Sequence, residues 1–481
     1  MSTHANEKLK LSAKLGFGAG DIFGGGSMVV ISIFYAYFLT DVVLISPGLV
    51  GVVVLISKGW DAISDPIMGT ISDRTRTKYG RRRPYFLAGV ILVAISFFLL
   101  WYPVNYALEL HRFIYVVVTY LFFSTCYTIV MIPYFALASE ITTDYDERTS
   151  ITSIRMVFSM VSSLICAIVP WEIVKMAPDK REGFVIMAVI FGLFFSLPYL
   201  ATFFFTRERK DFQQKREPFN IKTTFVYPFK TPTFVNVLFM YLFSMTTLDV
   251  VMTTIVYYMT YYLGRSAETN YVLGVLLITQ IFAIVGAFFM ARRIGKKQTF
   301  FYATIYTLFI MAGSYLITGS SPGWIIYAFA FLVGIGTGVV LVMAYSIMPD
   351  VPDVDELYCG KRQEGIYSGL MTFLRKFGSA ISIFIVMQVL QLAGYQKPIR
   401  ETVNGVTKVI EQEQTDEFFL VLKLVFALVP AIFLLIAVYN TYKYSLTPET
   451  HNRLKVFLDR RRAGEEVSAD EEQALKKLLE G

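Results

Sequence analysis

Hydrophobic residues occur along this chain in long runs that are separated by short polar and charged segments. Twelve of these runs are about 20 residues long, the length that a helix needs to cross the hydrocarbon core of a bilayer. The predicted spans are residues 16–40, 48–72, 85–104, 113–138, 150–172, 183–206, 233–263, 270–291, 299–318, 323–348, 364–393 and 417–443. We therefore expect an all-α membrane protein with twelve transmembrane helices.

A basic polar segment, residues 207–232, divides the predicted spans into two groups of six. We expect two pseudo-symmetric six-helix bundles with polar segments around them. The expected boundaries are 1–15 for the N-terminus, 16–206 for the first bundle, 207–232 for the middle loop, 233–446 for the second bundle and 447–481 for a tail with a short amphipathic helix.

The two halves also repeat a charge pattern. An acidic stretch with an arginine, followed by a basic residue inside the next span, occurs after span four and again after span ten. These stretches are Glu140–Arg148 leading to Arg155, and Asp350–Arg362 leading to Lys376. Internal symmetry of this kind is typical of secondary transporters; two unrelated helix-capping loops are the alternative.

The net charge of +7 fits a membrane protein, in which Lys and Arg gather in the cytoplasmic segments. With the N-terminus inside, most of the basic residues fall on that side, so both termini are expected in the cytoplasm. The densest basic run, residues 74–83, connects two spans, where contact with anionic lipid headgroups explains it better than nucleic acid does.

Cysteine and histidine usage argues against an enzyme. The three cysteines are far apart in sequence, and the three histidines lie outside the predicted spans. The chain therefore offers no disulfide framework, no metal ligand set and no activated nucleophile within the membrane. A membrane-embedded enzyme is only a remote alternative.

Three charges interrupt the second predicted span. Lys58, Asp61 and Asp65 are three and four residues apart, a spacing that places them on one face of a helix. Charges inside a bilayer are costly, so they face a bundle interior or a water-filled cavity and pair with one another. An acid before Pro66 also fits a helix break, but this reading leaves Lys58 and Asp61 unexplained. The cluster predicts a cation site.

Several motifs resemble the glycoside-pentoside-hexuronide:cation symporters, the melibiose permease branch of the major facilitator superfamily. The matching residues are Asp21, the string Gly59–Gly69 (GWDAISDPIMG), Asp73–Arg76, Tyr79–Pro84 and Lys376. The resemblance extends over essentially the whole twelve-span body and implies the major facilitator fold with alternating access.

The resemblance implies a cation site in the first half and its charge partners. Asp61 and Asp65 would bind the cation, and Thr128 would supply an oxygen ligand. Lys376 would lie close to both acids, and Lys58 would share their face. Ser64 stands where Na⁺-using relatives have a side-chain amide, so either H⁺ or Na⁺ can be the coupling ion.

The resemblance also implies substrate and gating residues. Asp21 and Arg155 match positions that bind sugar hydroxyls or stabilise the site; Arg155 could instead pair with an acid of the 140–147 loop. Met131 replaces a second sugar-binding acid, and Phe135 or Tyr134 replaces a stacking aromatic residue. A charge network that locks one closed state is expected from Asp350, Asp353, Arg362 and Arg148.

The function expected from these features is cation-coupled uptake of a sugar or glycoside across a bacterial inner membrane. No cofactor is expected beyond the coupling H⁺ or Na⁺, and no metal beyond a possible Na⁺. The expected partners are the sugar, the cation and membrane lipids, without nucleic acid, and nothing in the chain requires more than a monomer. A lysolipid or other amphiphile transporter on the same fold is the alternative.

Overall fold

The computed structural model describes residues 8–142, 145–208, 227–359, 364–403, 406–410, 412–462, 465 and 468–480. Within these residues, twelve helices are long and apolar enough to cross a membrane, and each overlaps one predicted span. The expected twelve-span helical fold is confirmed.

The contacts along the chain define two compact units. Unit 1 comprises Met1–Lys215 together with Met387–Phe418, and unit 2 comprises Arg216–Val386 together with Phe419–Gly481. The segment 387–418, expected in the second bundle, thus makes its contacts with the first.

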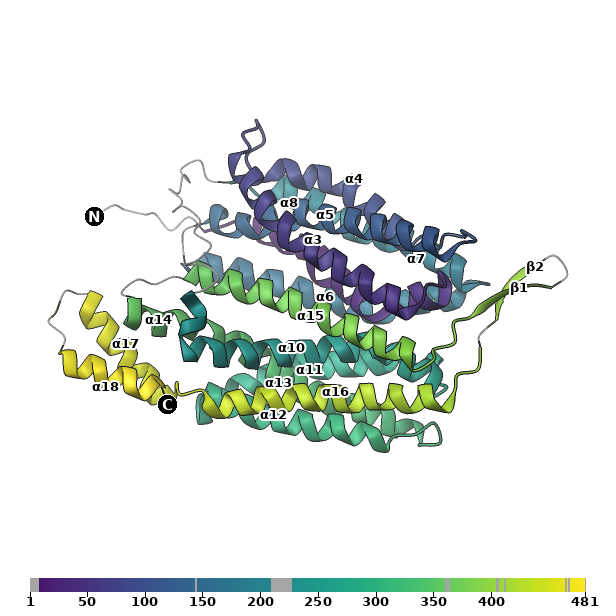
Figure 1. Cartoon of the computed structure of the whole chain (residues 1–481). Helices are drawn as coiled ribbons and strands as arrows, with labels where there is room; N and C mark the ends of the chain where they lie inside the picture. Colours follow the sequence, from purple (N-terminus) through teal and green to yellow (C-terminus); the bar gives the residue numbers. More distant parts are fainter. Residues whose placement is uncertain are drawn as a thin grey trace. The chain divides into compact units, whose positions relative to one another are not determined.

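Unit 1 contains the first six spans (Figure 1). Its helices are α1 (Leu11–Ala19), α2 (Asp21–Val30), the π-helical turns η1 (Ile31–Tyr35) and η2 (Phe38–Val42), α3 (Pro47–Arg74), α4 (Arg83–Leu100), α5 (Glu109–Ile141), α6 (Tyr145–Met176), α7 (Lys180–Ser196) and α8 (Pro198–Phe205).

Local chemistry explains where some of these helices begin. Pro47 occupies the first turn of α3, where its missing N–H costs no hydrogen bond. The first N–H groups of a helix lack intrahelical acceptors. At the start of α4, the carboxylate of Glu208 accepts hydrogen bonds from the backbone N–H groups of Arg81, Arg82 and Arg83 at 2.6 to 3.1 Å.

Small residues bring α2 against α6. A Cβ atom added at Gly25 would lie 2.2 Å from the Oγ of Ser159, and one at Gly26 would lie 2.2 Å from the Oγ of Ser162. Only glycine permits this approach, as at other small-residue contacts between membrane helices. This close contact fixes the position of Asp21 at the start of α2.

The segment 387–418 begins within α15 (Glu364–Leu392) and continues as an antiparallel hairpin of β1 (Ile399–Val403) and β2 (Val406–Ile410), with Ile399 opposite Ile410. Its polar side chains bond to the rest of unit 1: Gln391 to Gly48 (2.6 Å), Tyr395 to Asp41 (2.9 Å) and Lys397 to Glu109 (3.0 Å). The hairpin was not expected, although Asn-Gly between two β-branched runs is a strong hairpin signal.

Unit 2 contains the other six spans. Its elements are η3 (Tyr227–Lys230), α10 (Pro232–Tyr257), the π-helical turn η4 (Tyr258–Tyr262), η5 (Ser266–Glu268), α11 (Thr269–Ile294), α12 (Lys296–Gly313), η6 (Ser314–Leu316), α13 (Gly323–Ile347), η7 (Met348–Asp350), α14 (Val351–Cys359), α15 up to Val386, α16 (Asp416–Lys443) from Phe419, α17 (Pro448–Arg462) and α18 (Ala469–Glu480).

The tail forms two helices, α17 and α18, where one short helix was expected, and both pack on unit 2 near α14 (Figure 1). Phe457, Leu458 and Leu475 are buried in the same hydrophobic cluster as Val354 of α14 and Phe234 of α10. Removing this apolar surface from water stabilises the docked tail.

The first span of each unit ends in the same way. η2 ends span one and η4 ends span seven, and in both the next backbone N–H returns to the first residue of the turn, Val43 to Phe38 and Leu263 to Tyr258, at 3.0 Å. Single π turns are rare and often mark functional positions. Residues of the two spans can therefore be compared by their distance in sequence from the shared turn, with Phe38 matched to Tyr258.

Candidate functional site

The residues predicted to bind the cation meet between α3 and α5. α3 carries Asp61 and Asp65 one helical turn apart, and α5 packs along it. The Oγ1 of Thr128 donates a hydrogen bond to Asp65 at 2.7 Å and lies 3.4 Å from the Oγ of Ser64. The structure therefore brings together two carboxylates and two hydroxyls inside a membrane span.

Ser124 joins this site and was not predicted from the sequence. It lies one turn before Thr128 on α5 and donates a hydrogen bond to Asp61. The signal that could have found it is spacing: two hydroxyl residues four apart on one helix face two acids four apart on its neighbour. Each carboxylate thus receives its own hydroxyl.

The two predicted lysines belong to different units. Lys58 is half-buried and its Nζ lies 3.4 Å from Asp61, one turn along α3, as the spacing suggested. Lys376 is half-buried on α15 in unit 2. Its pairing with the acids of unit 1 stays a prediction.

Asp21, Arg155 and Phe135 also come together in unit 1. The Nε of Arg155 lies 3.8 Å from a carboxylate oxygen of Asp21, beyond hydrogen-bonding distance. The Arg155 guanidinium stacks on the ring of Phe135, 5.5 Å from its centre, and Phe135 is 46% exposed. A loose ion pair beside an open aromatic face can receive a polar ligand.

Tyr134 and Met131 lie beside this group but in the core of unit 1, and their expected contact with substrate stays a prediction. Both are fully buried. The Tyr134 hydroxyl donates to the carbonyl of Phe17 at 2.7 Å, and the Met131 sulfur accepts from Tyr199 at 3.2 Å. Successive residues of a helix point about 100° apart, so Tyr134 packs in the core while Phe135 remains exposed.

The expected gating residues are only partly described. Lys296 contacts Asp350 at 2.8 Å, and His451 of α17 contacts Asp353 at 3.3 Å, all within unit 2. Arg362 and the side chain of Arg148 lie outside the described residues. The role of this network in gating stays a prediction.

A second charge cluster, at the end of α3 in unit 1, was not predicted as a network. Arg82 is buried and donates hydrogen bonds to Ser72, Asp73 and Glu140, the last at 3.1 Å from Nε. Arg81 also donates to Glu140, at 2.6 Å. The basic run expected to contact lipid headgroups therefore has a structural part.

Unit 2 holds a further ion pair that the sequence analysis missed. Arg375 on α15 donates two hydrogen bonds, of 2.6 and 2.9 Å, to the carboxylate of Asp249 on α10. Both residues lie within membrane-spanning helices. Asp249 is the single acid of its span, and an isolated acid in an apolar run is a signal for a functional residue.

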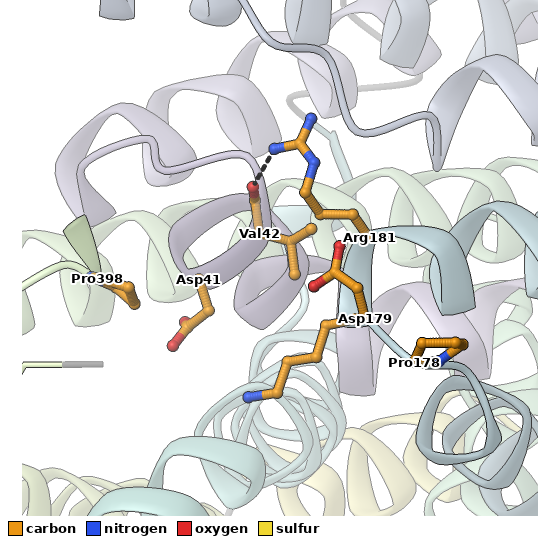
Figure 2. Close-up of a pocket in the computed structure, with 7 residues that line it drawn as sticks. Asp41, Val42, Pro178, Asp179, Arg181 and Pro398 are labelled. Carbon is orange, nitrogen blue, oxygen red and sulfur yellow. Dashed lines mark hydrogen bonds between the residues drawn. The ribbon is translucent and has the colours of Figure 1, made fainter. Parts of the chain in front are cut away.

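Two cavities are lined neither by the cation-site residues nor by the two acid–arginine pairs. One, of about 200 Å³ in unit 1, is lined by Asp41, Val42, Pro178, Asp179, Lys180, Arg181 and Pro398. In it Arg181 donates to the Val42 carbonyl at 3.3 Å (Figure 2). The other, of about 420 Å³ in unit 2, includes Lys296, Asp350 and His451. Burial raises the pKa of Tyr444, which also lines it, well above its usual range.

Among the described residues, no group of three or more His, Cys, Asp or Glu side chains could hold a metal ion. The donor set at Asp61 and Asp65 instead consists of carboxylate and hydroxyl oxygens. Such oxygens suit a hard monovalent cation, and either carboxylate alone can take a proton.

Twelve spans with charged pairs inside the helices define a membrane transporter, and the comparisons with known proteins agree. The chain belongs to the family of MFS/sugar transport proteins, which it matches over residues 16–448. The expected membership of the melibiose permease branch is confirmed, and the protein is a transporter and not an enzyme.

Its relatives are named as symporters or transporters. The Escherichia coli inner membrane symporter YicJ is 26% identical, over 97% of this chain and 99% of its own. The isoprimeverose transporter of Lactiplantibacillus pentosus is 26% identical, over 80% and 81%. A sodium-dependent lysophosphatidylcholine symporter of Danio rerio is 22% identical, over 95% and 91%.

Solved structures show the same fold. A D-xylose-proton symporter has a TM-score of 0.60 with 13% sequence identity, covering 79% of this chain and 90% of that one. Relatives and fold together identify a cation-coupled symporter with a small-molecule substrate.

Proposed function

We propose that this protein carries a sugar or glycoside across a bacterial inner membrane together with a monovalent cation, H⁺ or Na⁺. The observation that carries the proposal is the pairing of Asp61 with Ser124 and of Asp65 with Thr128 inside a membrane span. Carboxylates within a membrane span are costly, so they are rare and mark ion or substrate pathways.

Cation and substrate are coupled because each stabilises the arrangement that the other needs. A bound cation offsets the charge of the two aspartates, and the substrate then meets an ordered site at Asp21, Arg155 and Phe135. Such coupling is reciprocal, so each ligand raises the affinity for the other by the same factor. In the empty carrier, Lys376 neutralises the acids, which permits the return step without a cation.

The substrate is a sugar or glycoside because the residues near Asp21 offer carboxylate, guanidinium and an aromatic face. Sugars present hydroxyls to the first two and an apolar ring face to the third. The relative named as an isoprimeverose transporter supports this class.

A lysolipid is the second candidate, favoured by the lysophosphatidylcholine symporter that aligns with 95% of this chain. Uptake of a labelled lysophosphatidylcholine by proteoliposomes, compared with uptake of labelled sugars, separates the two classes. Transport of the lipid without any sugar would replace the proposal.

We place both termini in the cytoplasm, because the basic segments then lie on the inner side. The E. coli relative named as an inner membrane symporter supports the membrane assignment. The protein is proposed to act as a monomer without a resident cofactor.

The cation site is tested by Asp61→Asn and Asp65→Asn. Each change removes a charge that the cation needs, so uphill accumulation of sugar in vesicles should fall at least tenfold, while exchange of internal for external sugar persists. Glu172→Gln, which removes an acid that pairs with Lys175 within α6, is the matched control. Normal accumulation in both aspartate variants would refute the assignment.

The coupling ion is decided in a weakly buffered, Na⁺-free suspension. We expect the medium to become alkaline when the transported sugar is added, because Ser64 provides one hydroxyl where a larger oxygen set would favour Na⁺. No pH change, followed by uptake after Na⁺ is added, would instead make Asp61, Asp65 and Thr128 a Na⁺ site.

A further inference from the structure

We propose that Asp249 and Arg375 form a second sugar-binding pair, in unit 2, whose unused hydrogen-bonding groups are completed by substrate hydroxyls. This inference rests on the proposed function and names a sugar contact within unit 2 that no expectation from the sequence included.

The pair joins two membrane-spanning helices. Asp249 of α10 and Arg375 of α15 are far apart in sequence, yet the guanidinium and the carboxylate form a bidentate pair, with both bonds below 3.0 Å. We call this pair the fork. The two side chains are 18% and 22% exposed. The pair is thus ordered by its own contact and still partly accessible.

The contact between Arg375 and Asp249 does not use all of their hydrogen-bond donors and acceptors. A guanidinium has five N–H groups and a carboxylate about four acceptor positions, and the fork uses two of each. Within the described part of the chain, neither side chain makes any further hydrogen bond. Three N–H donors and two acceptor positions therefore remain on a partly accessible pair.

Unused polar groups at this depth need a polar occupant, because hydrocarbon cannot satisfy them. The fork is neutral overall, so it attracts neither a cation nor an anion strongly. A neutral molecule with several hydroxyls fits best: one hydroxyl can donate to the carboxylate while its neighbour accepts from the guanidinium.

An aromatic pair lies near the fork. The hydroxyls of Tyr241 and Tyr345 are 3.3 Å apart, and both tyrosines are close enough to Arg375 to interact electrostatically. Tyr345, on α13, is 53% exposed. An open tyrosine ring offers the apolar face of a sugar a surface with a hydrogen-bonding edge.

The arrangement repeats that of unit 1 on the corresponding helices. In each unit an acid lies on the first span and an arginine on the fifth: Asp21 with Arg155, and Asp249 with Arg375. Measured back from the shared π turn, Tyr241 occupies the position of Asp21, and Asp249 lies about two turns nearer that turn. Unit 2 thus retains an acid–arginine pair at a different depth.

The test measures sugar binding to purified protein by isothermal titration, with D-xylose, D-galactose and methyl β-D-glucoside as probes. Asp249→Asn and Arg375→Lys should each weaken binding of the best probe at least tenfold. Asp249→Asn leaves Arg375 without its charged partner, and Arg375→Lys cannot form both hydrogen bonds to Asp249. The double variant Asp249→Asn/Arg375→Gln is therefore included. It contains no unpaired charge, and it should fold and still bind the probe at least tenfold more weakly.

Glu268→Gln/Arg265→Gln removes another acid–arginine pair of unit 2, with a separation of 3.7 Å, and is the matched control. The affinity of the double Asp249/Arg375 variant for the cation, measured from the stabilisation that the cation gives, should remain within twofold of wild type. Wild-type sugar affinity in that folded variant would make the pair purely structural and overturn the inference alone. Wild-type protein that binds none of the three sugars would overturn the proposed function with it.

Discussion

Arg82 and Arg375 are both buried or half-buried arginines that pair with aspartates, yet they use their donors differently. Arg82 bonds to Ser72, Asp73 and Glu140, so each of its three guanidinium nitrogens has a protein partner. Arg375 bonds only to Asp249 in the described structure and remains partly accessible. The number of donors left over separates an arginine that holds the fold from one that can receive a ligand.

Arg155 resembles Arg375, because it too has donors that can receive a ligand. Its Nε is buried and has no hydrogen-bond partner among the residues that the structure describes, and its contact with Asp21 is longer than a hydrogen bond. The looser of the two acid–arginine pairs is therefore more available to substrate. The tighter one, Asp249 with Arg375, offers mainly its outer donors.

The largest effect on stability is expected for Arg82→Gln. It would leave Glu140 and Asp73 without their common partner, and breaking such a buried pair typically costs about 3 kcal/mol. The midpoint of thermal unfolding should drop clearly, whereas the double variant Asp249→Asn/Arg375→Gln should change it little. Equal losses in both would mean that the two clusters are alike and structural.

A smaller loss is expected for Gly25→Ala. The new methyl group would lie 2.2 Å from the Oγ of Ser159, so α2 must move away from α6, and overpacking of this kind costs about 2 kcal/mol. The shift also separates Asp21 from Arg155, so sugar affinity should fall along with thermal stability. Gly313→Ala, where no atom lies within 4 Å of the added Cβ, is the control.

The smallest effect concerns binding alone. Asp21→Ala and Arg155→Ala should each weaken sugar binding about tenfold, or ~1.4 kcal/mol, with less change in cation binding. Titration of both ligands in detergent measures this directly. Equal loss of sugar and cation binding would show that the pair supports the site without contacting the substrate.

Much of the fold could be predicted because membrane spans are local features. Each span is a run of apolar residues in one stretch of sequence, and all twelve were found. The hairpin β1–β2 was not predicted, and the tail was predicted as one helix instead of α17 and α18. Short β-branched segments and amphipathic tails lack the long apolar runs that identify a span.

The acid pair of the cation site was likewise determined by sequence alone, since Asp61 and Asp65 share a helix and their spacing places them on one face. Only the tertiary structure decided which partners they meet. Ser124 reaches Asp61 because α5 packs on α3, Phe135 stays accessible while Tyr134 does not because helix rotation orients them, and Asp249 meets Arg375 across 126 residues of chain. Helical periodicity is encoded in neighbouring residues, whereas the contact of one helix with another depends on packing over the whole unit.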